Sequence, residues 1–277
     1  MNLACLPTAR DNLRQSVSDL LGLRLGLNAL VDVTSTSSVD IDTSRVSIMG
    51  VSLGAITGVN FGAIANSTMG GDLAALDGMY AVTAASLESP AGGIANFLLE
   101  SPEFGPVIQG QLLLQASEDF VNFVTQTFGT TALTTAQYRQ AVPGFLDALT
   151  AEQLASINAV FAEFAFAAQT VIDAGDPTNY GAILGSNTPV HMLTVVGDGG
   201  EVNLPDQVNP VVTSLPLSGQ NPLAAIIGLE QVSSTVMGET AVSGQVQFTE
   251  GAHASSLSPT ASPAATVEMQ RQVAAYI

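Results

Sequence analysis

Residues 45–65 read RVSIMGVSLGAITGVNFGAIA and join three patterns in a short span. Arg45–Met49 alternates apolar and polar residues, which predicts a β-strand. Leu53–Ala65 is rich in apolar and small residues and predicts a helix. Between them, Gly50-Val51-Ser52-Leu53-Gly54 has the form G-x-S-x-G, in which a serine lies on a sharp turn between a strand and a helix. Because another strand is predicted beyond the helix, this order is typical of a parallel α/β sheet.

The turn also carries a chemical prediction. A serine on such a turn is exposed and strained, so the pattern indicates that Ser52 is a nucleophile. Gly50 and Gly54 are expected to prevent clashes between side chains and the neighbouring backbone. Since the helix begins directly behind Ser52, we expect the main-chain N–H of Leu53 to stabilise negative charge on a reacting carbonyl oxygen.

A serine hydroxyl needs a histidine to accept its proton, and the chain has two histidines. His253 lies in Gly251-Ala252-His253-Ala254-Ser255, directly after a predicted strand, on a loop from which an imidazole could reach the turn. His191 lies inside a predicted strand, where a packing role is more common. We therefore assign the general base to His253.

The histidine in turn needs a carboxylate to orient it, and in such folds this acid lies between the serine and the histidine along the chain. The loop after Val196 offers Asp198, Glu201 and Asp206. Asp206 begins a D-x-V-x-P segment and is the preferred acid. Asp198 is the alternative, although Asp-Gly-Gly is also common in turns.

The remaining chain predicts further strands and helices of the same class, with a long helical insertion. Other predicted strands are Met79–Ala84, His191–Val196 and Gln245–Thr249, and other predicted helices are Thr8–Val31 and Pro263–Ile277. Capping-box patterns begin helical runs at Thr134 and Thr150. The predicted division is a hydrolase core over 1–84, a helical cap or lid over 85–187, and the rest of the core over 188–277.

The second helical run has apolar residues on more than one face, from Leu154 to Val171. Burial explains such a pattern most simply, and a surface that meets an apolar substrate is the alternative. Single carboxylates elsewhere in the chain are expected to be solvated surface groups.

Composition excludes several classes of function. The formal net charge is −18 and lysine is absent, which disfavours nucleic-acid binding. Cys5 is the only cysteine, so no intrachain disulfide forms, and no metal site or cofactor motif is predicted. No apolar run of eighteen residues predicts a transmembrane segment, and no signal peptide is recognisable at the start of the chain.

Several segments together are similar to one family. Residues 9–16 (ARDNLRQS), the turn around Ser52, Leu204–Val208 and Gly251–His253 resemble bacterial extracellular lipases of the virulence-factor (Pla/cef) type, in the α/β-hydrolase superfamily. The resemblance implies hydrolysis of carboxylic esters or lipids through an acyl-enzyme, without a cofactor, and an extracellular or cell-surface location.

The chain departs from this family at its front, where the resemblance implies further strands and an oxyanion loop ahead of residues 9–16. The expected fold is therefore an N-terminally truncated α/β-hydrolase. We expect its activity to be low, because the loss of one oxyanion donor lowers the rate about a hundredfold or more. The strand before Ser52 would be an open edge, which favours a homo-oligomer. The alternative function is a catalytically weak or inactive scaffold that binds apolar ligands, and a peptidase is a weaker third reading.

Overall fold

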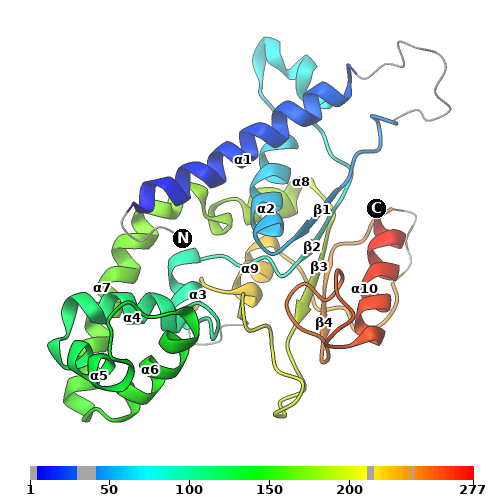
Figure 1. Ribbon diagram of the computed structural model, residues 1–277. Helices are drawn as coiled ribbons and strands as arrows, with labels where there is room; N and C mark the ends of the chain where they lie inside the picture. Colours follow the sequence, from blue (N-terminus) through cyan, green and yellow to red (C-terminus); the bar gives the residue numbers. More distant parts are fainter. Residues whose placement is uncertain (1–4, 30–41, 211–214, 237, 239) are drawn as a thin grey trace.

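The computed structural model describes residues 5–29, 42–210, 215–236, 238 and 240–277. Its centre is a sheet of four parallel strands in the order β1-β2-β3-β4 (Figure 1). The strands are β1 Ile48–Val51, β2 Ala85–Glu88, β3 Val190–Val195 and β4 Gly244–Phe248. The prediction of an α/β fold with a parallel sheet is confirmed.

Two strand predictions need correction. The strand predicted over Arg45–Met49 begins later, at Ile48, and runs to Val51. The strand predicted over Met79–Ala84 is wrong: the 3₁₀ helix η1, Gly71–Met79, precedes an irregular segment, and β2 begins at Ala85. All four β2 side chains are buried, including the polar Ser86 and Glu88. Because prediction relies on the pattern of apolar residues, a strand with buried polar residues is not recognised.

Helices cover both faces of the sheet (Figure 1). On one face, α1 Leu6–Leu27, α2 Leu53–Ala65, α8 Gly181–Asn187 and α9 Gln220–Ile227 enclose the largest apolar core. On the other face, α10 Pro263–Tyr276 packs Met269 and Val273 against Leu193 and Val195 of β3. The helix predicted over Thr8–Val31 ends earlier, at Leu27, and Val31 lies outside the described residues.

A group of helices lies between β2 and β3, and all of them except the first share a core of their own. The group consists of α3 Ile94–Glu100, α4 Gly105–Ala116, α5 Glu118–Phe128, α6 Thr135–Asp147 and α7 Ala151–Ile172. Phe120, Val124, Phe145 and Phe161 are buried together there. Capping boxes at Thr134 and Thr150 are confirmed by bonds to Gln137 and Gln153.

The boundaries of this helical region differ from the predicted 85–187. Residues 85–88 form the sheet strand β2, and α8 packs on α2 in the main core. Two 3₁₀ turns, η2 Asp173–Gly175 and η3 Pro177–Asn179, lead from α7 to α8. The helical insertion therefore lies between β2 and these turns.

Among the described residues, one helix is long and apolar enough to cross a membrane, over Ala151–Gly175, with a mean hydropathy of 1.4. A single helix of this kind is weak support for a membrane span, and this one packs against α1 and α3. Its apolar faces are not all buried. Phe161 and Ala168 are buried, whereas the Phe166 side chain is 78% exposed.

Candidate active site

Ser52 lies on the turn between β1 and α2 in a strained backbone conformation, with φ 55° and ψ −121°. Positive φ is uncommon for a residue with a side chain, and it is the conformation that a nucleophile turn requires. The turn is tied to the sheet because the N–H of Ser52 donates to the main-chain oxygen of Glu88 at 2.9 Å. The predicted position of Ser52 between a strand and a helix is confirmed.

The two glycines of the turn differ in their roles. A Cβ atom at Gly50 would lie 2.6 Å from the main-chain oxygen of Gly54 and 2.8 Å from the Cα of Ala55. The close approach of α2 to β1 therefore requires glycine at position 50. At Gly54 a Cβ atom would meet nothing within 4 Å, so the prediction that this glycine prevents a clash is wrong.

Leu53 is the first residue of α2, so its main-chain N–H has no acceptor within the helix. The main-chain oxygen of Ser52 already accepts from Ala55 and Ile56, which fixes the first turn of α2. The N–H of Leu53 thus lies beside Ser52 at the positive end of a helix dipole. This arrangement supports its predicted role as an oxyanion donor.

His253 and Asp206, predicted as base and acid, are in direct contact. The Nδ1 atom of His253 lies 3.0 Å from Oδ1 and 2.9 Å from Oδ2 of Asp206. The Asp206 side chain is fully buried, and the His253 side chain is 18% exposed. His253 lies on the loop after β4, next to Ala254, whose φ of 61° is strained. The structure therefore brings together two residues that are 47 positions apart in sequence.

Asp206 is held by several donors besides His253. Its Oδ1 accepts from the N–H groups of Val208 and Asn209 at 2.9 and 3.0 Å. Its Oδ2 accepts from Nε2 of Gln220 at 3.1 Å, and Gln220 is completely buried at the start of α9. Gln220 was not found from the sequence, because glutamine in an unpredicted helix carries no local signal of such a contact.

Asp198, the alternative acid, is exposed and closes its own turn. Its carboxylate accepts from the N–H of Gly200 at 2.7 Å and from Nδ2 of Asn203 at 2.8 Å. The Asn203 bond and the Gly200 N–H lower the pKa of Asp198. Since these bonds engage its carboxylate, the geometry favours Asp206.

His191 is buried in the middle of the sheet. Its Nδ1 lies 3.0 Å from Oγ of Ser86, and its Nε2 lies 3.1 Å from Oε1 of Gln272 on α10. Burial lowers the pKa of His191. Both ring nitrogens have partners, which supports the predicted packing role.

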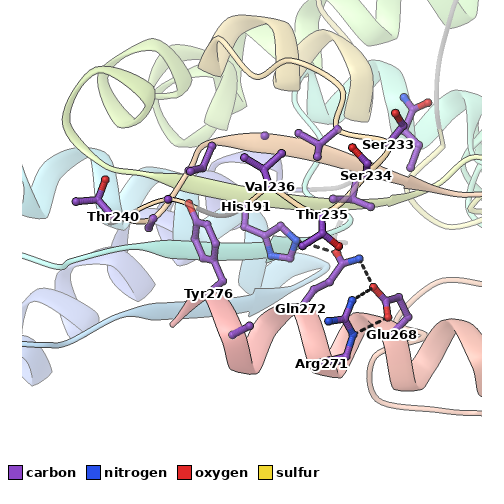
Figure 2. A pocket seen from close by; sticks show the side chains of 18 residues that line it. His191, Ser233, Ser234, Thr235, Val236, Thr240, Glu268, Arg271, Gln272 and Tyr276 are labelled. Carbon is purple, nitrogen blue, oxygen red and sulfur yellow. Dashed lines mark hydrogen bonds and ion pairs between the residues drawn. The ribbon is translucent and has the colours of Figure 1, made fainter.

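A cavity of about 620 Å³ opens beside His191 (Figure 2). It is lined by residues 232–236 and by the C-terminal half of α10, including Gln272 and Tyr276. His191 lies near the start of β3, whereas Asp206 follows the end of β3. Neither Ser52, Asp206 nor His253 lines this cavity, so we place the candidate active site by the chemistry of these three residues.

Two carboxylates predicted to be solvated are buried instead. Asp176 is completely buried and accepts from the N–H groups of Gly93 and Ile94, which satisfies the start of α3. Glu88, at the end of β2, is 2% exposed and accepts from both the N–H and the hydroxyl of Ser256. Neither carboxylate has neighbours in the sequence that distinguish it from a solvated one.

The candidate site is therefore assembled at the carboxyl end of the sheet. Ser52 follows β1, Asp206 follows β3 and His253 follows β4, and the strands are parallel. The His253–Asp206 contact is formed, while Oγ of Ser52 makes no hydrogen bond to His253 in the described part of the chain. Within those same residues, no three side chains of the types that bind metal ions are clustered.

No protein-family model matches the chain, and comparisons with curated proteins and with solved structures gave no significant match.

Proposed function

We propose that the protein is a serine hydrolase of carboxylic esters, an esterase or lipase with an α/β-hydrolase fold. The observation that supports it best is the His253–Asp206 pair at the sheet edge where the strained turn presents Ser52. A nucleophile, a base and an acid that orients the base are the groups that such chemistry needs. The resemblance to Pla/cef-type lipases, and the extracellular location that it implies, belong to the same proposal.

In the proposed reaction, Oγ of Ser52 attacks the ester carbonyl carbon and its proton passes to Nε2 of His253. The contact with Asp206 fixes the other nitrogen, Nδ1, as the proton donor to the carboxylate, which leaves Nε2 to accept. His253 then gives the proton to the departing alcohol, and an acyl-serine ester remains. Water, deprotonated by His253, attacks this ester and releases the carboxylic acid and free Ser52.

The oxygen of the attacked carbonyl gains negative charge in both steps. The N–H of Leu53, at the start of α2, is the donor that we assign to it. An enzyme with a single such donor is expected to be about a hundredfold slower than one with two.

Exposed apolar side chains near the three residues support an ester with an apolar acyl chain. Leu53 is 62% exposed, Leu204 lies two residues before Asp206, and Leu257 lies four residues after His253 and is 67% exposed. Leu53 begins α2, and Leu204 and Leu257 lie on the segments after β3 and β4, so all three follow the carboxyl ends of strands, as the three candidate residues do. In this proposal the helices α3–α7 act as a cap over the acyl chain.

Hydrolysis of p-nitrophenyl butyrate by wild type and by Ser52→Ala tests the proposal. We expect wild type to release p-nitrophenol and Ser52→Ala to lose most of this rate, because the nucleophile is removed. Ser186→Ala is the matched control, because Ser186 is an exposed serine on α8 whose hydroxyl donates to the main-chain oxygen of Ala182 in the preceding turn of the same helix. A fluorophosphonate should add its mass to wild type and to the control, but not to Ser52→Ala. Equal rates for all three proteins would refute the enzyme.

One observation favours the second candidate, a hydrolase scaffold that binds apolar ligands without turnover. Oγ of Ser52 is not hydrogen-bonded to His253 in this structure. On that reading, wild type and Ser52→Ala would both bind a fatty acid and neither would hydrolyse the ester.

We also propose that β1 pairs with a second copy of the chain. Among the described residues β1 pairs with β2 alone, and the N–H groups of Ile48 and Ser52 point toward β2. Since peptide groups alternate along a strand, those of Met49 and Val51 face the open edge, where Met49 is 45% exposed. Light scattering at micromolar concentration should report a dimer or larger, and a monomer would refute this.

A further inference from the structure

Glu88 is a buried carboxyl that links the nucleophile turn to the histidine loop. Its main-chain oxygen accepts from the N–H of Ser52 at 2.9 Å. Its side chain accepts from the N–H of Ser256 at 3.1 Å and from the Ser256 hydroxyl. Ser256 is itself buried and lies three residues after His253. One residue therefore contacts both sides of the candidate site.

The Ser256 contact also fixes the histidine loop from the opposite side. The main-chain oxygen of Ser256 accepts from Nε2 of Gln270 on α10 at 2.7 Å. The loop is thus held between β2, through Glu88, and α10, through Gln270. Without Glu88, two buried donors of Ser256 would lose their acceptor.

The charge of Glu88 has no cation of its own. No arginine forms an ion pair with it in the described part of the chain, and its side chain is nine-tenths or more buried. Burial raises the pKa of Glu88, and the two hydrogen bonds from Ser256 oppose this rise. The titratable groups that act on it are His253, on the loop after β4, and Asp206, on the loop after β3. Ser52 and Ser256, which touch it, carry no charge.

We propose that Glu88 is a positioning residue of the hydrolase site, which holds the His253 loop through Ser256 and acts as a second carboxylate on the His253–Asp206 pair. This inference rests on the proposed function for its role in catalysis. It adds a carboxyl to the three expected residues and places it on β2, between the strands that carry the nucleophile and the acid.

Glu88 and His253 lie on either side of the Ser256 contact, so the charge of each is expected to act on the other. An ionised Glu88 stabilises the imidazolium form of His253, and protonation of Glu88 removes this effect. Glu88→Gln keeps an oxygen that can accept from Ser256 but removes the charge. The variant is therefore expected to leave the loop in place while removing the effect of the carboxylate charge on the imidazole.

An NMR titration of the imidazole signals in the full chain measures this directly. The chain has two histidines, so His191 serves as an internal control. In wild type we expect the His253 signals to show their own step and a second, smaller step from Glu88. In Glu88→Gln the smaller step should vanish and the main step should move to lower pH, with His191 unchanged. The acidic limb of the pH profile of kcat/KM should move with it.

Several outcomes separate the two proposals. An unchanged His253 titration in a folded Glu88→Gln overturns the role of Glu88, whatever the activity. A shifted titration in a protein without esterase activity supports the linkage and refutes the hydrolase. If circular dichroism shows that Glu88→Gln does not fold, wild type and Ser256→Ala decide. A single-step His253 titration in wild type that Ser256→Ala leaves unaltered overturns the inference.

Discussion

Replacing Asp206 with asparagine removes the charge that orients His253 and keeps a side chain of nearly the same shape. The amide oxygen of asparagine can keep the bonds from the N–H groups of Val208 and Asn209. Its NH₂ group then stands where Oδ2 accepts from Gln220 and His253, so that donors face donors, and the oxygen at the Oδ1 position, 3.0 Å from Nδ1, is already occupied by the two N–H groups. His253 relieves this by accepting at Nδ1, which places its proton on Nε2. That tautomer cannot accept the proton of Ser52.

The expected loss follows from this change of tautomer. Removing the orienting carboxylate of a serine hydrolase by the same substitution lowers kcat about 10⁴-fold, which is about 5 kcal/mol in the barrier. Folding is affected less: one buried donor of Gln220 loses its acceptor, at a cost of about 1–3 kcal/mol in the free energy of unfolding. Initial rates on p-nitrophenyl butyrate and urea unfolding measure the two quantities.

Asp198→Asn is the matched control, since Asp198 precedes Asp206 in the same loop and its carboxylate accepts from Gly200 and Asn203 of its own turn. We expect this variant to keep the wild-type kcat. The assignment of the acid is refuted if Asp206→Asn stays within tenfold of wild type in kcat. A larger loss in Asp198→Asn than in Asp206→Asn would transfer the role to Asp198.

Three further predictions concern the turn, the buried histidine and the apolar rim. Gly50→Ala should destabilise the fold by about 3 kcal/mol, because its Cβ meets backbone at 2.6 Å, whereas Gly54→Ala should be neutral or stabilising in the same urea unfolding. Burial lowers the pKa of His191 in the folded protein, so the unfolded chain takes up a proton at this histidine at higher pH than the folded protein does. The free energy of unfolding should therefore fall as the pH drops below 6.5, and it should fall less in His191→Gln. Leu257→Ser should raise KM for long acyl esters more than for acetate, and equal KM changes would contradict an apolar acyl site.

The sequence revealed those parts of the site that depend on neighbours along the chain. The turn around Ser52 and the bounds of α2 are local features, and both are confirmed. The two capping boxes are local too, since each joins residues three positions apart. The His253–Asp206 contact is a long-range feature, and its two residues were predicted from the order of serine, acid and histidine typical of α/β-hydrolases and from the D-x-V-x-P segment that begins at Asp206.

The features that were missed depend on distant parts of the chain. The strand β2 was predicted too early in the chain, because Ser86 and Glu88 are buried polar residues. Their side chains form hydrogen bonds with His191 and Ser256. Apolar periodicity predicts a strand only where its buried face is apolar. The prediction fails where the buried side chains are polar and are hydrogen-bonded to distant parts of the chain. Gln220 was missed for the same reason, because its partner Asp206 lies fourteen positions away in another segment.

The strand order explains why the additional carboxyl is on β2. The four strands lie side by side in chain order, and main-chain bonds continue the ladder past their ends: Ser52 donates to Glu88, Ser89 to Leu193 and Val196 to Phe248. Each loop at this edge therefore starts from a fixed point beside its neighbour. Since β1 carries the nucleophile and β3 leads to the acid, the end of β2 must lie between them. Glu88 therefore reaches the nucleophile turn with its main-chain oxygen and the histidine loop with its buried side chain.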